Sequence, residues 1–207
     1  DVRSYVEQLA AEVKSDDKIT VLTESEIVDF EGFQGNFKTS VRAGVVSEAQ
    51  EIKHGVIIVA TGASEYTPKE YLYGEDERVI TQTQLSDRLA DKGAADLDTV
   101  VMIQCVGCRQ ADRDYCARVC CSNAIKNALK LKEINPQMDI TILFRDIRTY
   151  GFSEDYYREA SNSDVKFIRY EPDDKPQVEA VEEEGRPVLR VTLPDYILGR
   201  KLAIDAD

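Results

Sequence analysis

The chain has 207 residues, of which 43% are hydrophobic and 31% charged, as is ordinary for soluble globular proteins. Its net charge of −13 argues against nucleic acid or an anionic membrane surface as a partner, because both require clustered lysine and arginine. No apolar run approaches the roughly 18 residues of a membrane-spanning helix, and no leader is visible at the N-terminus, so we expect a soluble, cytoplasmic protein rather than an integral membrane protein.

The first part of the chain predicts a helix followed by a β-meander. Residues 1–13 place apolar side chains at helical spacing, and the segments that follow carry β patterns separated by glycine turns. His54, the single histidine, comes after these segments and is interpreted as structural. The strands are expected at residues 18–23, 26–30, 36–42 and 45–52.

The meander leads into an apolar stretch, Val56–Ala60, that predicts a buried strand. It runs into a turn at Thr61 and Gly62, where the backbone could approach a ligand closely, because ligands collect beyond the carboxyl ends of strands in open α/β sheets. A tight turn after a core strand explains the same residues equally well. Both interpretations stay open at this point.

Residues 63–98 are polar and irregular, apart from a short helix expected at 81–90. The stretch 91–98 has the composition of a linker. We therefore place a domain boundary there, which gives domains 1–92 and 93–207.

The second domain is predicted to begin with a βαβ unit. An apolar β-branched run at 99–103 precedes a helical pattern at 122–134, and a second strand pattern follows at 139–144. In a nucleotide-binding unit the first turn would read G-x-G-x-x-G, but here it contains only Gly107. The fold class is therefore α/β. Further on, we expect a helix at 153–160 and strands at 165–170, 177–181, 187–193 and 201–204.

All five cysteines of the chain occupy this turn and the helix start after it. An odd number of cysteines in a chain without a secretion signal favours a metal or redox role over a disulfide framework. Cys116 and Cys120 are four residues apart and would face the same way on a helical turn, with Cys121 about 100° further round. Cys105 and Cys108 lie ahead of them, across the loop.

Three chemistries compete for these thiols. A [4Fe–4S] cluster is favoured, because it takes four thiolates with close and irregular spacing. Structural zinc is second, because zinc sites usually pair two C-x2–4-C knuckles and this sequence offers only one clean C-x2-C, Cys105 with Cys108. A redox dithiol or merely buried thiols come last. Arg109, Arg113 and Arg118 run through the loop and could offset the charge of a cluster, although solvated surface arginines are at least as good an interpretation.

Three stretches of the chain resemble a known family. They are QCVG with YCARVCCSNAIKNALKLKEINP, ILFRDIRTYGF, and IIVATGASEYTPKEYLYGEDERVIT. Together they are similar to the A subunits of heterodisulfide reductases and to related FAD and iron–sulfur subunits of electron-transfer complexes. These proteins have a thioredoxin-reductase-like core.

The resemblance implies a partial FAD-binding domain at 1–92, with a β-meander plus sheet. It also implies a Rossmann-like, NAD(P)-binding-type domain at 93–207, in which the cysteine loop replaces the glycine loop. The residues beside FAD would be Ala60, Thr61 and Gly62.

The family's cluster ligands match Cys105, Cys116, Cys120 and Cys121. Relatives commonly carry serine at the position of Cys108, which makes Cys108 the spare thiol.

The implied function is that of an oxidoreductase subunit that relays electrons between FAD and a [4Fe–4S] cluster to partner iron–sulfur subunits, with a homodimer of the parent protein as one arrangement. No catalytic side chain is expected. The glycine motifs that bind FAD in the family lie outside residues 1–207, so we expect an internal piece of a longer protein that is inactive and binds FAD poorly by itself.

Two alternatives remain. The chain could be a non-catalytic, zinc-bound or metal-free α/β module for subunit assembly. NADPH binding by residues 93–207 is disfavoured because the phosphate-binding glycines are missing, and Arg145, where an NADP enzyme would place an arginine, is a weak signal by itself.

Overall fold

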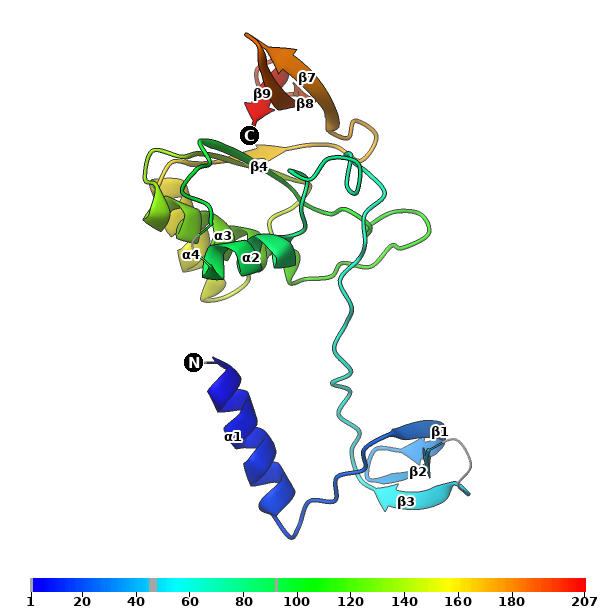
Figure 1. Cartoon of the computed structure of the whole chain (residues 1–207). Coiled ribbons are helices and arrows are strands. Elements are labelled where there is room, and N and C mark those ends of the chain that lie inside the picture. Colours follow the sequence, from blue (N-terminus) through cyan, green and yellow to red (C-terminus); the bar gives the residue numbers. More distant parts are fainter. Residues whose placement is uncertain (1, 45–47, 92) are drawn as a thin grey trace. The chain divides into compact units, whose positions relative to one another are not determined.

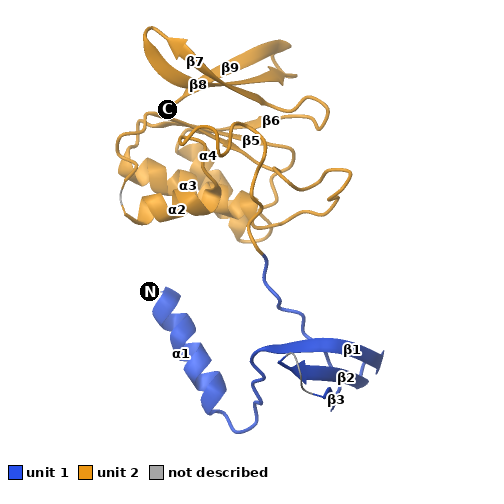
Figure 2. Ribbon diagram, turned by 45° about the vertical axis from the view of Figure 1, so that its right-hand side comes forward, with its two compact units in different colours: residues 1–63 blue, residues 64–207 orange. Residues whose placement is uncertain are grey.

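The computed structural model describes residues 2–44, 48–91 and 93–207. The chain divides into two compact units, Asp1–Ala63 and Ser64–Asp207, which are coloured separately in Figure 2. Both contain helices and strands, which confirms the mixed α/β class.

The first unit contains a helix and a small antiparallel sheet. Helix α1 spans Val2–Ser15, and strands β1 (Ser25–Phe33), β2 (Asn36–Ala43) and β3 (Gln50–His54) pair in the order β1-β2-β3. The predicted helix and three of the meander strands are thus confirmed, although β3 begins later than expected and residues 45–47 lie outside the described part. His54 Nε2 lies 2.7 Å from Thr39 Oγ1, in agreement with a structural role.

Two predicted strands of this unit are wrong. Residues 18–23 form no strand, and neither do residues 56–60, where Ile58 and Val59 are 87% and 78% exposed. Both segments have the apolar, β-branched composition of strands, but a strand also needs a hydrogen-bonded neighbour. The described strands of the unit pair only with one another, so these two segments stay exposed and unpaired.

The second unit is built on two consecutive βαβ units, the first of them as predicted. Strands β4 (Thr99–Ile103), β5 (Asp139–Phe144) and β6 (Val165–Arg169) form a parallel sheet in that order. Helix α3 (Cys120–Ile134) connects β4 to β5, and α4 (Ser153–Asn162) connects β5 to β6. Helix α2 (Gln82–Ala90) precedes them and starts with a capping box between Thr81 and Gln84.

An antiparallel sheet covers the other face of the parallel one. It consists of β7 (Gln177–Glu183), β8 (Arg186–Asp195) and β9 (Arg200–Ala206), which confirms the last three predicted strands. Figure 1 shows this sheet on one side of β4 and helices α2, α3 and α4 on the other. The unit therefore has three layers: helices, parallel sheet and antiparallel sheet.

Two hydrophobic cores fill the spaces between these layers. The larger one joins the helices to the parallel sheet and includes Leu131 and Ile142, both fully buried. The smaller one joins the two sheets through Leu143, Tyr170 and Leu193. Because the parallel sheet is buried on both faces, its strands are apolar along most of their length, which makes them easy to recognise in the sequence.

The division between the units differs from the predicted one, which placed residues up to 92 in the first domain. Helix α2 packs on α3, and its Leu85 and Leu89 lie in the larger core. Asn127 of α3 also donates hydrogen bonds to the carbonyl and side-chain oxygens of Gln82. The boundary therefore falls at Ala63, because a helix follows the apolar surface that buries it rather than its neighbours in sequence.

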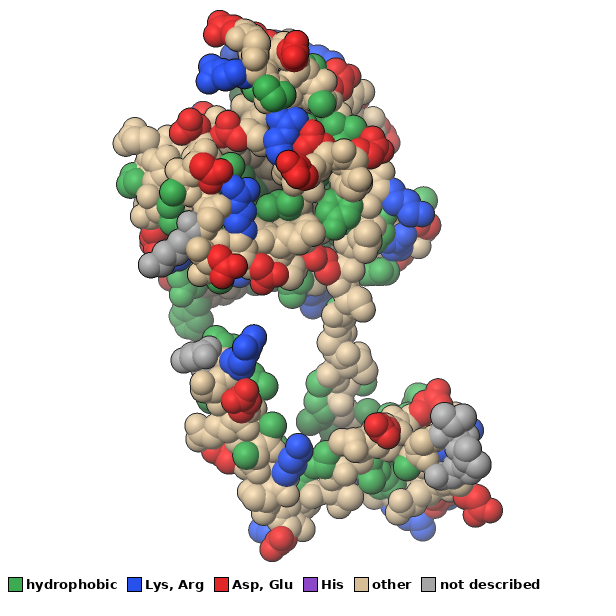
Figure 3. All heavy atoms as spheres, in the orientation of Figure 1, with side chains coloured by type: hydrophobic (Ala, Val, Ile, Leu, Met, Phe, Trp, Pro, Cys, Tyr) green, Lys and Arg blue, Asp and Glu red, His purple; other side chains and the backbone are tan. Residues whose placement is uncertain are grey.

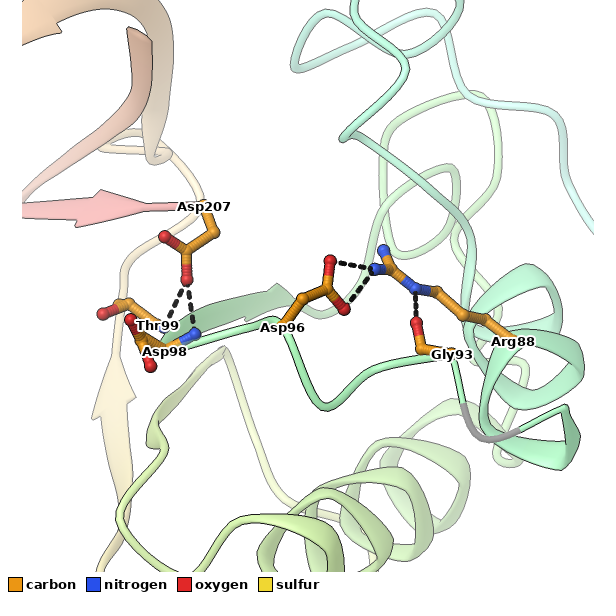
Figure 4. Close-up of polar contacts among 6 residues, drawn as sticks. All are labelled: Arg88, Gly93, Asp96, Asp98, Thr99 and Asp207. Atoms are coloured by element: carbon orange, nitrogen blue, oxygen red, sulfur yellow. Dashed lines mark hydrogen bonds and ion pairs between the residues drawn. The ribbon is translucent and has the colours of Figure 1, made fainter. Parts of the chain in front are cut away.

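Polar contacts fasten the start of β4 from two directions (Figure 4). The Asp207 carboxylate accepts hydrogen bonds from the backbone N–H groups of Asp98 and Thr99, at 2.6 and 2.7 Å. On the other side, Arg88 of α2 binds Asp96 through two hydrogen bonds of 3.1 Å.

We expect Asp207→Ala to lower the free energy of unfolding by about 1 kcal/mol. Hydrogen bonds to a charged acceptor are worth about 1.5–3 kcal/mol, and exposure to solvent weakens the two hydrogen bonds that the Asp207 carboxylate accepts. Urea unfolding measures the change. Asp207→Asn keeps an acceptor oxygen and should lose less than half as much. Equal stability of the alanine variant and the unmodified chain would contradict this role.

Acidic side chains are spread over the face of the second unit that is visible in Figure 3. Figure 3 shows Asp and Glu side chains scattered over the visible face of the second unit, with Lys and Arg between them. Among the described helices, none combines the length and apolar character that crossing a bilayer requires.

Candidate metal centre

The cysteines lie where the first βαβ unit turns from strand to helix. Strand β4 ends at Ile103, a loop follows, and Cys120 and Cys121 are the first two residues of α3. The N-cap residue, Val119, forms no side-chain cap. The free N–H groups of a helix start favour negative charge, so the two thiols occupy a position that stabilises thiolates.

The five thiols lie in one stretch of the second unit, from the loop after β4 to the first turn of α3. Cys105 hydrogen-bonds to Cys108, and Cys120 hydrogen-bonds to Cys121. The two pairs are close enough that Cys105 and Cys108 act electrostatically on Cys120, and Cys116 acts on Cys108. All five are free cysteines, so no disulfide competes for them.

These contacts favour ionisation of Cys105 over Cys108 and of Cys121 over Cys120. The hydrogen bond from Cys108, with the backbone N–H of Arg145, lowers the pKa of Cys105 to about 6. Likewise the hydrogen bond from Cys120, with the backbone N–H of Arg148, lowers the pKa of Cys121 to about 7. The same hydrogen bonds, together with burial, raise the pKa values of the two donors, Cys108 and Cys120.

Backbone N–H groups also point at the other sulfurs of the loop. The N–H of Ala117 hydrogen-bonds to Cys108, and that of Arg118 donates to Cys116 Sγ at 3.3 Å. Hydrogen bonds of this kind stabilise thiolates and the sulfurs of metal clusters. The chemistry of the donor set, thiols surrounded by N–H groups, therefore fits an anionic iron–sulfur group.

The loop that provides these donors has a constrained backbone. Cys105, Gly107 and Arg109 all have positive φ angles, of 64°, 69° and 56°. For a residue other than glycine such a conformation costs about 1–2 kcal/mol, and residues held in it cluster at functional sites. The loop also fits tightly under Tyr66, because a Cβ atom built on Gly107 would lie 2.1 Å from the ring.

In the described part of the chain, no three His, Cys, Asp or Glu side chains have the arrangement of a metal site. The thiols of Cys105 and Cys108 interact with each other, and so do those of Cys120 and Cys121. The predicted ligand set of Cys105, Cys116, Cys120 and Cys121 therefore stays a prediction. Cys108, predicted as the spare thiol, is buried within the same group.

The structure gives different surroundings to the three arginines of the loop, which the sequence alone could not distinguish. Arg109 is largely buried and forms an ion pair of 2.6 Å with Asp146. Arg113 stacks on Tyr66, with 4.5 Å between its guanidinium carbon and the ring centroid. Arg118 is exposed.

Sequence reasoning missed the roles of Tyr66, Asp146 and Tyr170. Tyr170 donates a hydrogen bond of 2.6 Å to the carbonyl oxygen of Gln104, the residue before Cys105. No local pattern marks these residues, because they reach the loop from other segments of the second unit. The one available signal was the position of Asp146 shortly after β5, at the carboxyl edge of the parallel sheet.

The predicted FAD contacts lie elsewhere. Ala60, Thr61 and Gly62 belong to the first unit, where they are exposed and outside regular secondary structure. Their role in binding FAD stays a prediction.

Fold and site together define an α/β protein with a thiol centre at the carboxyl edge of a parallel sheet. Comparison with known sequences is more specific. By sequence the chain is a relative of the A subunits of heterodisulfide reductases. No family model matches it.

Three curated relatives illustrate the similarity. The A subunit of the H(2):CoB-CoM heterodisulfide,ferredoxin reductase of Methanothermobacter marburgensis is 35% identical over 178 residues, which cover 77% of this chain and 26% of the relative. The iron–sulfur A subunit of the CoB–CoM heterodisulfide reductase of Methanocaldococcus jannaschii is 34% identical over 186 residues, 81% of this chain and 28% of the relative.

The third is the A subunit of the Ferredoxin/F(420)H(2)-dependent CoB-CoM heterodisulfide reductase of Methanosarcina acetivorans, 37% identical over 160 residues, 69% of this chain and 20% of the relative. The chain thus spans about a quarter of the length of the curated relatives it matches.

Proposed function

We propose that this chain holds a [4Fe–4S] cluster on Cys105, Cys116, Cys120 and Cys121 and takes part in electron transfer within a heterodisulfide-reductase-like oxidoreductase. The observation that supports the proposal is the placement of all five cysteines between the end of β4 and the start of α3, with backbone N–H groups directed at their sulfurs. The name of one relative, which describes an iron–sulfur subunit, supports the same cofactor class.

A bound cluster would supply one-electron transfer, which the side chains of this chain cannot perform. The chain's own part is to hold the group and set its surroundings. The thiols provide the ligands, and the start of α3 with the loop N–H groups stabilises their negative charge. Cys116 and Cys120 are only partly buried, so the side of the site that they form is the one closest to solvent and to a redox partner.

The assignment of Cys108 as the spare thiol rests on the resemblance, and its burial makes it the position to test. A buried thiol that hydrogen-bonds to a ligand can be a spare group that tunes the ligand, or it can be a ligand itself. Replacement with serine separates the two roles, because serine keeps a hydrogen-bond donor but is a poor iron ligand.

FAD binding and assembly with partner iron–sulfur subunits are also part of the proposal, at the level of the longer protein. They rest on the resemblance and on the names of the relatives, which are subunits of reductases. For the 207-residue chain by itself we expect poor FAD binding, because the glycine motifs that bind FAD in the family lie outside residues 1–207 and, in the part that the structure describes, no strand pairs with Ala60–Gly62.

The test is iron, sulfide and zinc analysis, with an absorption spectrum, on chain purified or reconstituted without oxygen. We expect about four irons and four sulfides per chain, as for one [4Fe–4S] cluster, together with the visible absorption of an iron–sulfur protein. Cys121→Ser should lose most of the iron, because it removes a ligand thiolate.

Cys108→Ser is the matched control, with the same substitution in the same loop, and should retain all of the iron. If Cys108→Ser loses iron while one of the four assigned ligands can be replaced without loss, the ligand set is wrong. Stoichiometric zinc, or a colourless chain that cannot take up iron and sulfide, would replace the proposal with that of a zinc-bound or metal-free assembly module.

A further inference from the structure

The cysteine site contains buried hydrogen-bond donors that lack an acceptor. Among the described residues, four buried side-chain atoms lack a hydrogen-bond partner, and all four belong to residues of the cysteine loop or of the segment after β5. Leaving a buried donor unsatisfied costs about 1–3 kcal/mol, and more when it is charged. The atoms are Gln104 Nε2, Arg109 Nη1, Arg145 Nε and Thr149 Oγ1.

Arg109 is held facing the site. Its Nη2 forms the ion pair with Asp146, its positive charge helps to lower the pKa of the Cys105 thiol, and its Nη1 is buried without a hydrogen-bond partner. The guanidinium is thus fixed by a carboxylate on one side, while its buried Nη1 donors have no acceptor. An anionic occupant with sulfur acceptors would satisfy them.

Arg145 approaches Cys105 from the end of β5. Its backbone N–H hydrogen-bonds to the Cys105 sulfur, and its Nη1 donates to the carbonyl oxygen of Arg109. Arg145 and Cys105, together with Tyr170, line the same cavity of about 30 Å³. Arg145 therefore adds a second positive charge to the site. It also fixes the loop that carries Arg109, the first positive charge.

We propose that Arg109 and Arg145 set the reduction potential of the iron–sulfur group, an inference that rests on the proposed function. Reduction adds a negative charge to the group. Fixed positive charges and N–H donors stabilise the reduced state more than the oxidised state, and they do so strongly where solvent screening is weak. Arg109 is the stronger of the two because its side-chain charge acts on Cys105, and its partner Asp146 moderates its effect.

The Arg109–Asp146 pair provides a test based on the direction in which each substitution shifts the reduction potential. Arg109→Gln removes a positive charge and should lower the potential, whereas Asp146→Asn removes a negative charge and should raise it. If the pair were only a structural contact, both substitutions would damage the same site and would not move the potential in opposite directions.

The measurement is a redox titration, followed by electron paramagnetic resonance, on the reconstituted 207-residue chain. For Arg109→Gln we expect at least a tenfold fall in the ratio of reduced to oxidised cluster at a fixed applied potential, which is about 59 mV for one electron. Arg145→Gln should shift the ratio in the same direction and Asp146→Asn in the opposite one. Arg118→Gln removes an exposed arginine from the same loop and should change the ratio less than twofold, because water and salt screen it.

The outcomes separate the two claims. If the unmodified chain takes up no cluster, the proposed function fails, and the inference fails with it. If the cluster forms but Arg109→Gln behaves like Arg118→Gln, or if Arg109→Gln and Asp146→Asn shift the potential in the same direction, the inference is overturned while the proposed function stands. Should Arg109→Gln prevent cluster assembly, the opposite shifts expected for Arg145→Gln and Asp146→Asn decide the question.

Discussion

Gly107→Ala is expected to destabilise the second unit and to reduce iron uptake. Among the residues of the cysteine loop that are not ligands, we expect this alanine substitution to have the largest effect. The new Cβ would lie 2.1 Å from the ring of Tyr66, with two further ring atoms within 2.5 Å, so the ring must move. Tyr66 would then lose its stacking on Arg113. The φ angle of +69° adds a strain of about 1–2 kcal/mol for a residue with a side chain.

Urea unfolding and iron content measure the two effects, and two further variants separate their causes. Gly185→Ala, at a φ angle of +78° with nothing within 4 Å of its Cβ, should show the backbone strain alone. Adding Tyr66→Ala to Gly107→Ala removes the collision, so the double variant should regain stability and iron relative to Gly107→Ala. Additive losses in the double variant would show that Tyr66 does not constrain the loop.

Leu131→Ala is expected to lower the free energy of unfolding of the second unit by about 2–5 kcal/mol. Leu131 is fully buried where α3 packs on the sheet, and its truncation removes apolar contact and leaves a cavity. The same helix begins with Cys120 and Cys121. We therefore expect bound iron to be released at a lower urea concentration than in the unmodified chain.

Hydrogen exchange of the β4 and β5 amides is the direct measurement, because it reports on the second unit regardless of the first. Ile197→Ala is the control. Ile197 is 95% exposed between β8 and β9, and surface substitutions of this kind stay within about 0.5 kcal/mol. Equal loss of protection in the two variants would mean that the α3 contact does not stabilise the sheet.

The sequence was most informative where the signal is local. The strands at Thr99–Ile103 and Asp139–Phe144 and the helix between them were recognisable because apolar periodicity and end signals are encoded by neighbouring residues. The clustering of five cysteines at the turn between them was visible at once, and it indicated the place of the site.

The same local reasoning failed where the outcome depends on a distant partner. Residues 18–23 and 56–60 have the composition of strands, but pairing is decided by a neighbour that composition does not reveal, and both segments are unpaired in the structure. The boundary predicted after residue 92 was displaced for a related reason, since α2 joins the unit whose core accepts its apolar face.

The sequence by itself thus determined the elements of the second unit, the position of the cysteines and, through the resemblance, the relatives of the chain. Only the tertiary structure decided that Gly107 lies under Tyr66, that Arg109 forms an ion pair with Asp146, and that Arg109 is partly buried while Arg118 is exposed. The physical reason is that secondary structure depends on the covalent neighbours of a residue. The surroundings of a charged or ligating side chain depend instead on which distant segments pack around it, and here these are the end of β5, the segment before α2 and Tyr170 after β6.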